Sequence, residues 1–316
     1  LVDGSLVAGL AIQPRDIEAL DDGLVNQFTM GLRSALDSVS EGTTLQFVFK
    51  VGSDFSDVIH AHTERKIENL HPLVRTIAEH RERKLKHAQE SGELYRPHLF
   101  VFVRVPMIEP KKASLFKRKE VFSTNAALAH SETLEVLQQN LENLGNAFQA
   151  VGLSNSALSK NELVDQVYRY LNPKRSETDP APSLQVVQDV DLDSETLDDA
   201  DWLSSQSTRS QLVFGDLIVG FDQFTLDSKY HRLVTLKTLP EVTCAGQLSG
   251  FLRFPFHYDL IVSIQVPPQA SEMSKLQQKR KMAHSMAVTQ GGRASDLESE
   301  TTLSSTEELI RELLNT

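Results

Sequence analysis

The chain has 316 residues, of which 40% are hydrophobic and 24% are charged, and this composition excludes a disordered protein. Its formal net charge of −11 opposes a general attraction to nucleic acid or anionic lipid, so any such contact has to be local. One cysteine gives no internal disulfide, and no run of 18 apolar residues indicates a transmembrane helix. We therefore expect a cytoplasmic protein.

Apolar patterning in the first 130 residues predicts alternating strands and helices. Asp21 and Asp22 are suited to cap the first helix, and Pro72 is expected to kink or break the second helical region. A continuous apolar run predicts that the last strand is an interior one. The predicted order is strand, helix, strand, helix and strand, at residues 6–12, 21–39, 45–51, 54–89 and 98–106.

A similar order is predicted near the C-terminus. Strands are expected at 231–240 and 257–268, with a short helical turn between them and helices at 271–288 and 306–314. The first residue is Leu1, already close to a strand, and the second unit lacks its final strand. We therefore expect the chain to be a piece of a longer protein.

These patterns predict an α+β fold with two related strand-helix-strand-helix-strand units, the second truncated at the C-terminus. A helical connector ends at Asn172-Pro173, and an acidic segment without Lys or Arg at 176–201 predicts a solvated linker. The expected domains are a first α/β unit, the helical connector, an acidic linker or insertion and an incomplete second unit, at residues 1–130, 131–171, 172–210 and 211–316.

Segments that resemble nucleotide-binding or calcium-binding motifs lack the residues that would bind the ligand. The segment from Gly215 to Asp222 has two glycines but Phe and Asp where a P-loop needs Lys and Ser or Thr. The acidic run from Asp189 has Ser194 and Ala200 where a calcium loop needs Gly and Glu. We expect no cofactor in these residues. The histidines of the second helical region are also expected to be solvated and not to bind a metal. They are His60, His62 and His71, near Glu64, and His80 and His87, which lie among basic residues.

Cys244 is the one candidate for a nucleophile. A reactive thiol needs a nearby base, and His231 and His257 are each about thirteen positions away on predicted strands. A buried, unreactive thiol is the simpler interpretation. The enzyme hypothesis nevertheless stays open, centred on these three residues.

Two basic clusters suggest a partner. One is RERKLK at 81–86, and the other is KKASLFKRK at 111–119, where apolar side chains lie between cations. An exposed helix face with a mobile loop, an anionic membrane surface or membrane partner, and nucleic acid are the alternatives. The residues of the second cluster proposed to make contact are Lys111, Lys112, Leu115, Phe116, Lys117, Arg118 and Lys119.

Several stretches resemble the N-terminal region of TraC-like ATPases, which energise conjugative transfer by bacterial type IV secretion. They are VDGSLVAGLAIQP, RSALDSVSEGTTLQFVFKV, AEHRERKL, LNPKRSE and SQLVFGDLIVGFDQFTLDSKYHRLVTLKTLPEVTCAGQLSGFL. The positions most typical of the family are Asn172, Pro173, Leu239, Pro240, Thr243 and Gly246.

The resemblance implies a docking and assembly domain without catalytic residues, cytoplasmic but held at the inner membrane by partners of the secretion complex. It also implies that ATP and magnesium bind a motor domain after Thr316 and that the full-length protein self-associates. No direct nucleic-acid binding is expected. A free-standing cytoplasmic enzyme and a nucleic-acid-binding domain are the alternative functions.

Overall fold

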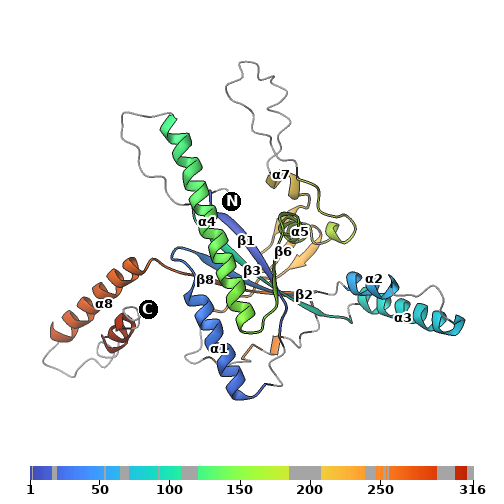
Figure 1. The fold of residues 1–316 in the computed structure, drawn as a ribbon, viewed down its shortest axis with the longest axis horizontal. Helices are drawn as coiled ribbons and strands as arrows, with labels where there is room; N and C mark the ends of the chain where they lie inside the picture. The colour runs from blue at the N-terminus through green and yellow to red at the C-terminus, as the bar shows by residue number, and fades with distance from the viewer. Residues whose placement is uncertain are drawn as a thin grey trace. The chain divides into compact units, whose positions relative to one another are not determined.

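The computed structural model groups the chain into two compact units, each described here by itself (Figure 1). Unit 1 comprises Leu1–Ala157 together with Phe254–Thr316, and unit 2 comprises Leu158–Arg253. Unit 2 is therefore an insertion in the sequence of unit 1. The structure describes residues 1, 3–15, 20–52, 55–64, 71–91, 93–107, 120–184, 208–238, 243, 247–248, 250–251, 254, 256–289 and 303–311.

Unit 1 is built on an antiparallel sheet with the strand order β4-β1-β3-β2-β8. Each strand places alternate side chains on one face, so the register aligns Leu10, Val101 and Phe47 in a row across three strands. The strands are β1 (Leu6–Ile12), β2 (Thr44–Gly52), β3 (Arg96–Val105), β4 (Asn155–Ala157) and β8 (Tyr258–Gln265).

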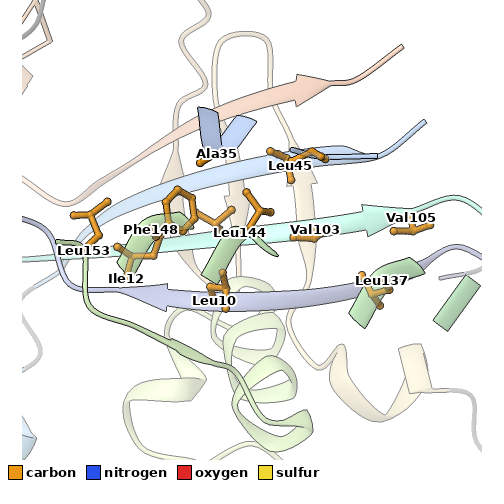
Figure 2. Packing of buried hydrophobic residues seen from close by; sticks show 12 residues of the cluster. Leu10, Ile12, Ala35, Leu45, Val103, Val105, Leu137, Leu144, Phe148 and Leu153 are labelled. Carbon is orange, nitrogen blue, oxygen red and sulfur yellow. The ribbon is translucent and has the colours of Figure 1, made fainter. Parts of the chain in front are cut away.

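Helices α1 (Asp22–Asp37) and α4 (Glu120–Ala150) supply the second layer of unit 1. Asp21 caps α1 as expected, because its side chain accepts a hydrogen bond from the Leu24 amide. Figure 2 shows side chains of α4 and the sheet in one packed cluster. The buried residues of this core are Leu10, Ile12, Ala35, Val39, Leu45, Val101, Val103, Val105, Leu137, Leu144, Phe148 and Leu153.

A buried polar side chain fixes α4 against the loop that precedes β2. Asn140 is 1% exposed; its Nδ2 donates to Thr43 Oγ1 at 3.3 Å, and its Oδ1 accepts from the Ser40 amide at 3.1 Å. Ser40 Oγ also donates to Asn140 Oδ1 at 2.9 Å. Because buried amides are costly without partners, this network specifies where α4 crosses the sheet.

The connection from β2 to β3 contains α2 (Ser56–Glu64) and α3 (Pro72–Glu90). Pro72 occupies the first turn of α3, where its missing N–H is no loss, and the His71 side chain caps the helix. The expected interruption at Pro72 is therefore confirmed as a helix start. After β8 come α8 (Gln269–Thr289) and a helix at residues 303–311.

Unit 2 combines short helices with an antiparallel sheet in the order β5-β6-β7. Ser159 and Glu162 form a reciprocal capping box at the start of α5, and Asn172 is the C-cap of that helix. Asp227 and Ser228 have φ of 47° and 66°, the left-handed values that a tight β6–β7 hairpin requires. The elements are α5 (Lys160–Leu171), η1 (Arg175–Glu177), α7 (Thr208–Leu212), β5 (Leu217–Val219), β6 (Phe224–Leu226) and β7 (Lys229–His231).

The α+β class is confirmed, and β3 is an interior strand as expected, between β1 and β2. The grouping of the second half differs from the expected domains, because β8 pairs with β2 of the first sheet instead of belonging to a separate unit at 211–316. The expected strand at 231–240 is also wrong in part, since β7 ends at His231 and residues 232–237 form no strand. An alternating pattern defines the two faces of a strand but does not choose its neighbour.

Truncation of Leu144 tests the core of unit 1. Leu144 is fully buried, so Leu144→Ala should lower the free energy of unfolding by about 3 kcal/mol, through lost burial and a residual cavity. Leu134 lies on the same helix but is 41% exposed, and Leu134→Ala should cost less than about 1 kcal/mol. Urea unfolding measures both, and equal losses would contradict this packing.

Candidate functional site

The helix pair α2 and α3 carries the first basic cluster of the sequence. The two helices contact each other, and Phe55 links their ends because its amide donates to Gln89 Oε1 at 3.1 Å. The Arg96 guanidinium lies 6.0 Å from the Phe55 ring centroid, within the range of a cation–π contact. These contacts hold the base of the helix pair next to the start of β3.

One side of α3 is turned toward α2 and the other toward solvent. Residues 78, 82, 85 and 89 recur at helical spacing and are partly buried, whereas none of the helix residues is fully buried. Beside this partly buried side runs a solvent-exposed stripe, with two apolar residues in the first half of the helix and two cations in the second. We call the exposed residues Leu73, Ile77, Arg81 and Lys84 the α3 outer face.

The α3 outer face combines apolar area with positive charge. The side chains of Leu73 and Ile77 are 66% and 61% exposed, and their spacing of four positions makes them neighbours on one side of the helix. Arg81 and Lys84 continue the same stripe. Glu82, the nearby carboxylate on α3, forms its ion pair with Lys86, outside this stripe. The face therefore suits an anionic surface or partner with apolar groups.

The histidines considered as metal ligands have other roles. His60 Nε2 lies 3.6 Å from Glu64 Oε1 on an exposed side of α2, and His71 Nδ1 accepts a hydrogen bond from the Leu73 amide at 3.3 Å. Among the residues that the structure describes, no group of three or more His, Cys, Asp or Glu side chains could hold a metal ion.

Shifts in pKa also arise from local structure. Hydrogen bonds from the Ser5 hydroxyl and amide, followed by the Arg104 guanidinium, hold the pKa of Asp3 well below its usual range. The Ser159 amide and hydroxyl lower the pKa of Glu162 within the capping box. Burial raises the pKa of Tyr258. The two carboxylates are thus capping or turn groups and not an acid–base pair.

Asn172, a position typical of the suspected family, organises unit 2. Its side chain is fully buried; Nδ2 donates to the carbonyl oxygens of Tyr168 at 2.9 Å and Leu212 at 2.7 Å. Its Oδ1 accepts from the amides of Phe214 at 3.0 Å and Gly215 at 3.2 Å. One amide side chain therefore joins the end of α5 to the segment that leads into β5.

A second polar contact continues this junction. Asp227 Oδ2 accepts from the amides of Lys174 at 2.8 Å and Arg175 at 2.6 Å, at the start of η1. The Arg175 guanidinium lies 4.4 Å from the Phe214 ring centroid, and Phe214 meets Tyr168 edge to face. The sequence marks Asn172 through its Asn-Pro helix end, but it gives no signal for the role of Asp227.

The hairpin of β5 and β6 exposes apolar side chains. Leu217, Ile218 and Val219 are 61%, 66% and 75% exposed, and Phe221 at the turn is fully exposed. Sequence reasoning missed this surface, because it considered the segment as a failed P-loop and as a family-like stretch but not as an exposed strand. The available signal was three consecutive aliphatic residues between Gly215 and Gly220 with no polar alternation.

Most of the other candidates from the sequence lie outside the described residues. The basic segment from Lys111 to Lys119 lies outside, as do Leu239, Pro240, Cys244 and Gly246. Thr243 is exposed and belongs to no helix or strand. His231 stacks on Phe224 in unit 2, whereas His257 meets Tyr95 edge to face in unit 1. Because Cys244 itself lies outside the described residues, the enzyme hypothesis centred on it stays a prediction.

The family model described as TraC protein matches residues 1–313. The chain belongs to the TraC family. This family serves F-type IV secretion, so the chain is a conjugative transfer protein and the resemblance found in the sequence is confirmed. Comparison with curated proteins finds no match. Within the described residues of this family member, no helix is long and apolar enough to cross a membrane.

Asn172→Asp tests the junction in unit 2. The change removes both donors to Tyr168 and Leu212 and places a buried carboxylate against their carbonyl oxygens. It should lower the free energy of unfolding of unit 2 by about 3 kcal/mol. Limited proteolysis with mass spectrometry measures the opening of α5 and β5.

The matched control is Asn161→Asp, an exposed position in the first turn of α5 where a carboxylate favours the helix dipole. It should leave the cleavage rate unchanged. Equal cleavage rates for the two variants would show that the Asn172 hydrogen bonds do not stabilise unit 2.

Proposed function

We propose that this chain is the non-catalytic N-terminal docking and assembly domain of a type IV secretion ATPase. It attaches the motor to the inner-membrane complex from the cytoplasmic side, as a peripheral protein. ATP and magnesium bind a separate motor domain, and the partners are inner-membrane components of the same secretion system. The observation that carries the proposal is the α3 outer face of a TraC family member.

The chemistry of this face fits a membrane-associated partner. Arg81 and Lys84 attract anionic headgroups or acidic side chains, while Leu73 and Ile77 add apolar contact once the partner is close. The net charge of the whole chain is negative, so the attraction has to act over short distances at a local cluster. A helix that projects between β2 and β3 and packs on α2 supplies such a cluster.

Charge reversal on α3 tests whether attachment depends on the α3 outer face or only on the net charge of the protein. The double variant R81E/K84E should lower recovery of the full-length protein with inner membranes by about tenfold or more, since each cation contributes about 1 kcal/mol at an anionic surface. Membrane flotation followed by immunoblotting measures the recovery. Co-purification of inner-membrane components of the secretion system should fall in parallel.

The control is R83E/K86E, which changes the net charge by the same amount on other sides of the same helix; since K86E also breaks the ion pair with Glu82, the circular dichroism spectrum checks that its helix content matches that of R81E/K84E. Its recovery should stay within about twofold of the parent protein. If both double variants lose recovery equally, the α3 outer face has no specific role in attachment.

The basic segment at 111–119 is a second contact in this proposal. Reversal of Lys117, Arg118 and Lys119 to Glu should weaken membrane-fraction recovery of the full-length protein without unfolding it, because local attraction to anionic groups is lost. The circular dichroism spectrum controls for folding. Unchanged recovery would remove this segment from the docking surface.

A further inference from the structure

The two edges of the small sheet in unit 2 are protected differently. β7 carries Lys229, which forms an ion pair with Glu177, and His231, which stacks on Phe224 at 5.0 Å between ring centroids. β5 carries Leu217, Ile218 and Val219 and has no charge, proline or bulge within it. Proteins usually protect exposed edges by short strand length, charges, proline or bulges, and β5 is short but, unlike β7, carries no charge, so its aliphatic edge is open to a pairing partner.

Hydrogen bonds of the hairpin show which backbone groups of β5 face outward. The Gly220 amide donates to Gln223 O at 2.8 Å, and the Asp227 amide donates to Asp216 O at 3.1 Å. Peptide groups alternate in direction along a strand, so Ile218, between these two residues, also directs its N–H and C=O toward β6. Leu217 and Val219 direct theirs toward the open edge. Among the described residues, β6 is the one strand paired with β5.

This spacing is complementary to itself. In an antiparallel pair of two β5 strands centred on Ile218, Leu217 of one copy lies opposite Val219 of the other. Their outward N–H and C=O groups then form two narrow pairs, which together make four hydrogen bonds. The two Ile218 side chains meet at the two-fold axis, and aliphatic side chains from both copies cover one another.

The charges next to β5 also fit the two-fold arrangement. Asp216 would lie opposite Gly220 of the other copy, so the two Asp216 carboxylates are separated and meet no like charge directly. Asp222, in the turn between β5 and β6, already forms an ion pair with Arg232, which follows β7. Lys229 and Arg232 are thus both ion-paired within unit 2, and β5 itself carries no cation, which disfavours an anionic lipid surface as its occupant.

We propose that β5 is a homodimer edge, at which two copies of this chain pair antiparallel about Ile218 and join their small sheets into one. This edge belongs to unit 2, whereas the α3 outer face belongs to unit 1, and the occupant of the edge is a second copy of the chain. The experiments below measure association of the chain with itself, so their outcome does not depend on whether the chain docks at a membrane.

Disulfide trapping tests the geometry. In a Cys244→Ser background, Ile218→Cys places two thiols at the axis, where facing Cα atoms about 4.5 to 5.5 Å apart permit a disulfide. The control is Tyr230→Cys on β7, a position that is 77% exposed. Mild oxidation at micromolar chain concentration should yield at least fivefold more cross-linked dimer for Ile218→Cys. Equal yields would overturn the proposal.

Charge exchange at the same position tests the association without a covalent bond. Light scattering after size exclusion should show a dimer for the parent chain, monomers for Ile218→Lys and for Ile218→Glu, and recovered dimer in their equimolar mixture. Ile218 is 66% exposed, so both variants should keep the parent circular dichroism spectrum.

Two results of this experiment would refute the homodimer edge. One is a parent chain that stays monomeric at about 100 μM, which would leave β5 to a peptide strand or a lipid surface. The other is an Ile218→Lys variant that dimerises as the parent does, which would place the dimer contact elsewhere. If a charged variant fails to fold, the disulfide yields decide.

Discussion

Gln46 and Ser263 are 217 positions apart, yet they lie opposite each other where β2 pairs with β8, and unit 1 is closed by this pairing. With β8 in place, β2 becomes an interior strand, and Ile264 and Val266 add to the core beside Leu45. Val266 also exchanges backbone hydrogen bonds with the turn before β2, at Gly42 and Thr43. Unit 1 therefore needs both ends of the sequence. The chain leaves the sheet of unit 1 after β4, forms unit 2, and returns to the same sheet at β8.

Unit 2 is stabilised more by polar junctions than by apolar burial. Among its described residues, the buried apolar side chains are Tyr168 and Leu212, both next to the fully buried Asn172. Asp227 adds a second link between η1 and the β6–β7 hairpin. Because these hydrogen bonds orient the small sheet without covering it, aliphatic side chains of β5 stay on the surface and are available for association.

Local features of both units were predictable because each depends on a short window of sequence. The Asp21 cap, the helix start at Pro72 and the helix end at Asn172 follow from backbone chemistry at single residues. The partner of residues 258–265 was not predictable, since a period of two defines faces and not neighbours. The exposed β5 was missed for a related reason: an aliphatic triplet has the same pattern in a buried strand as at an open edge. The basic cluster on α3 was predicted, whereas its common face with Leu73 and Ile77 required the packing of α3 on α2.

The insertion of unit 2 between β4 and β8 has a consequence for synthesis of the protein. A ribosome completes β2 about 200 residues before β8, which corresponds to roughly 10 to 40 s at ordinary elongation rates. During that interval the aromatic and aliphatic residues of β2 have one unpaired edge, while unit 2 is made and can fold as a separate body. The nascent chain is thus prone to aggregate through the open edge of β2 for as long as unit 2 is being made, and a chaperone that acts on it has to protect β2 until β8 arrives.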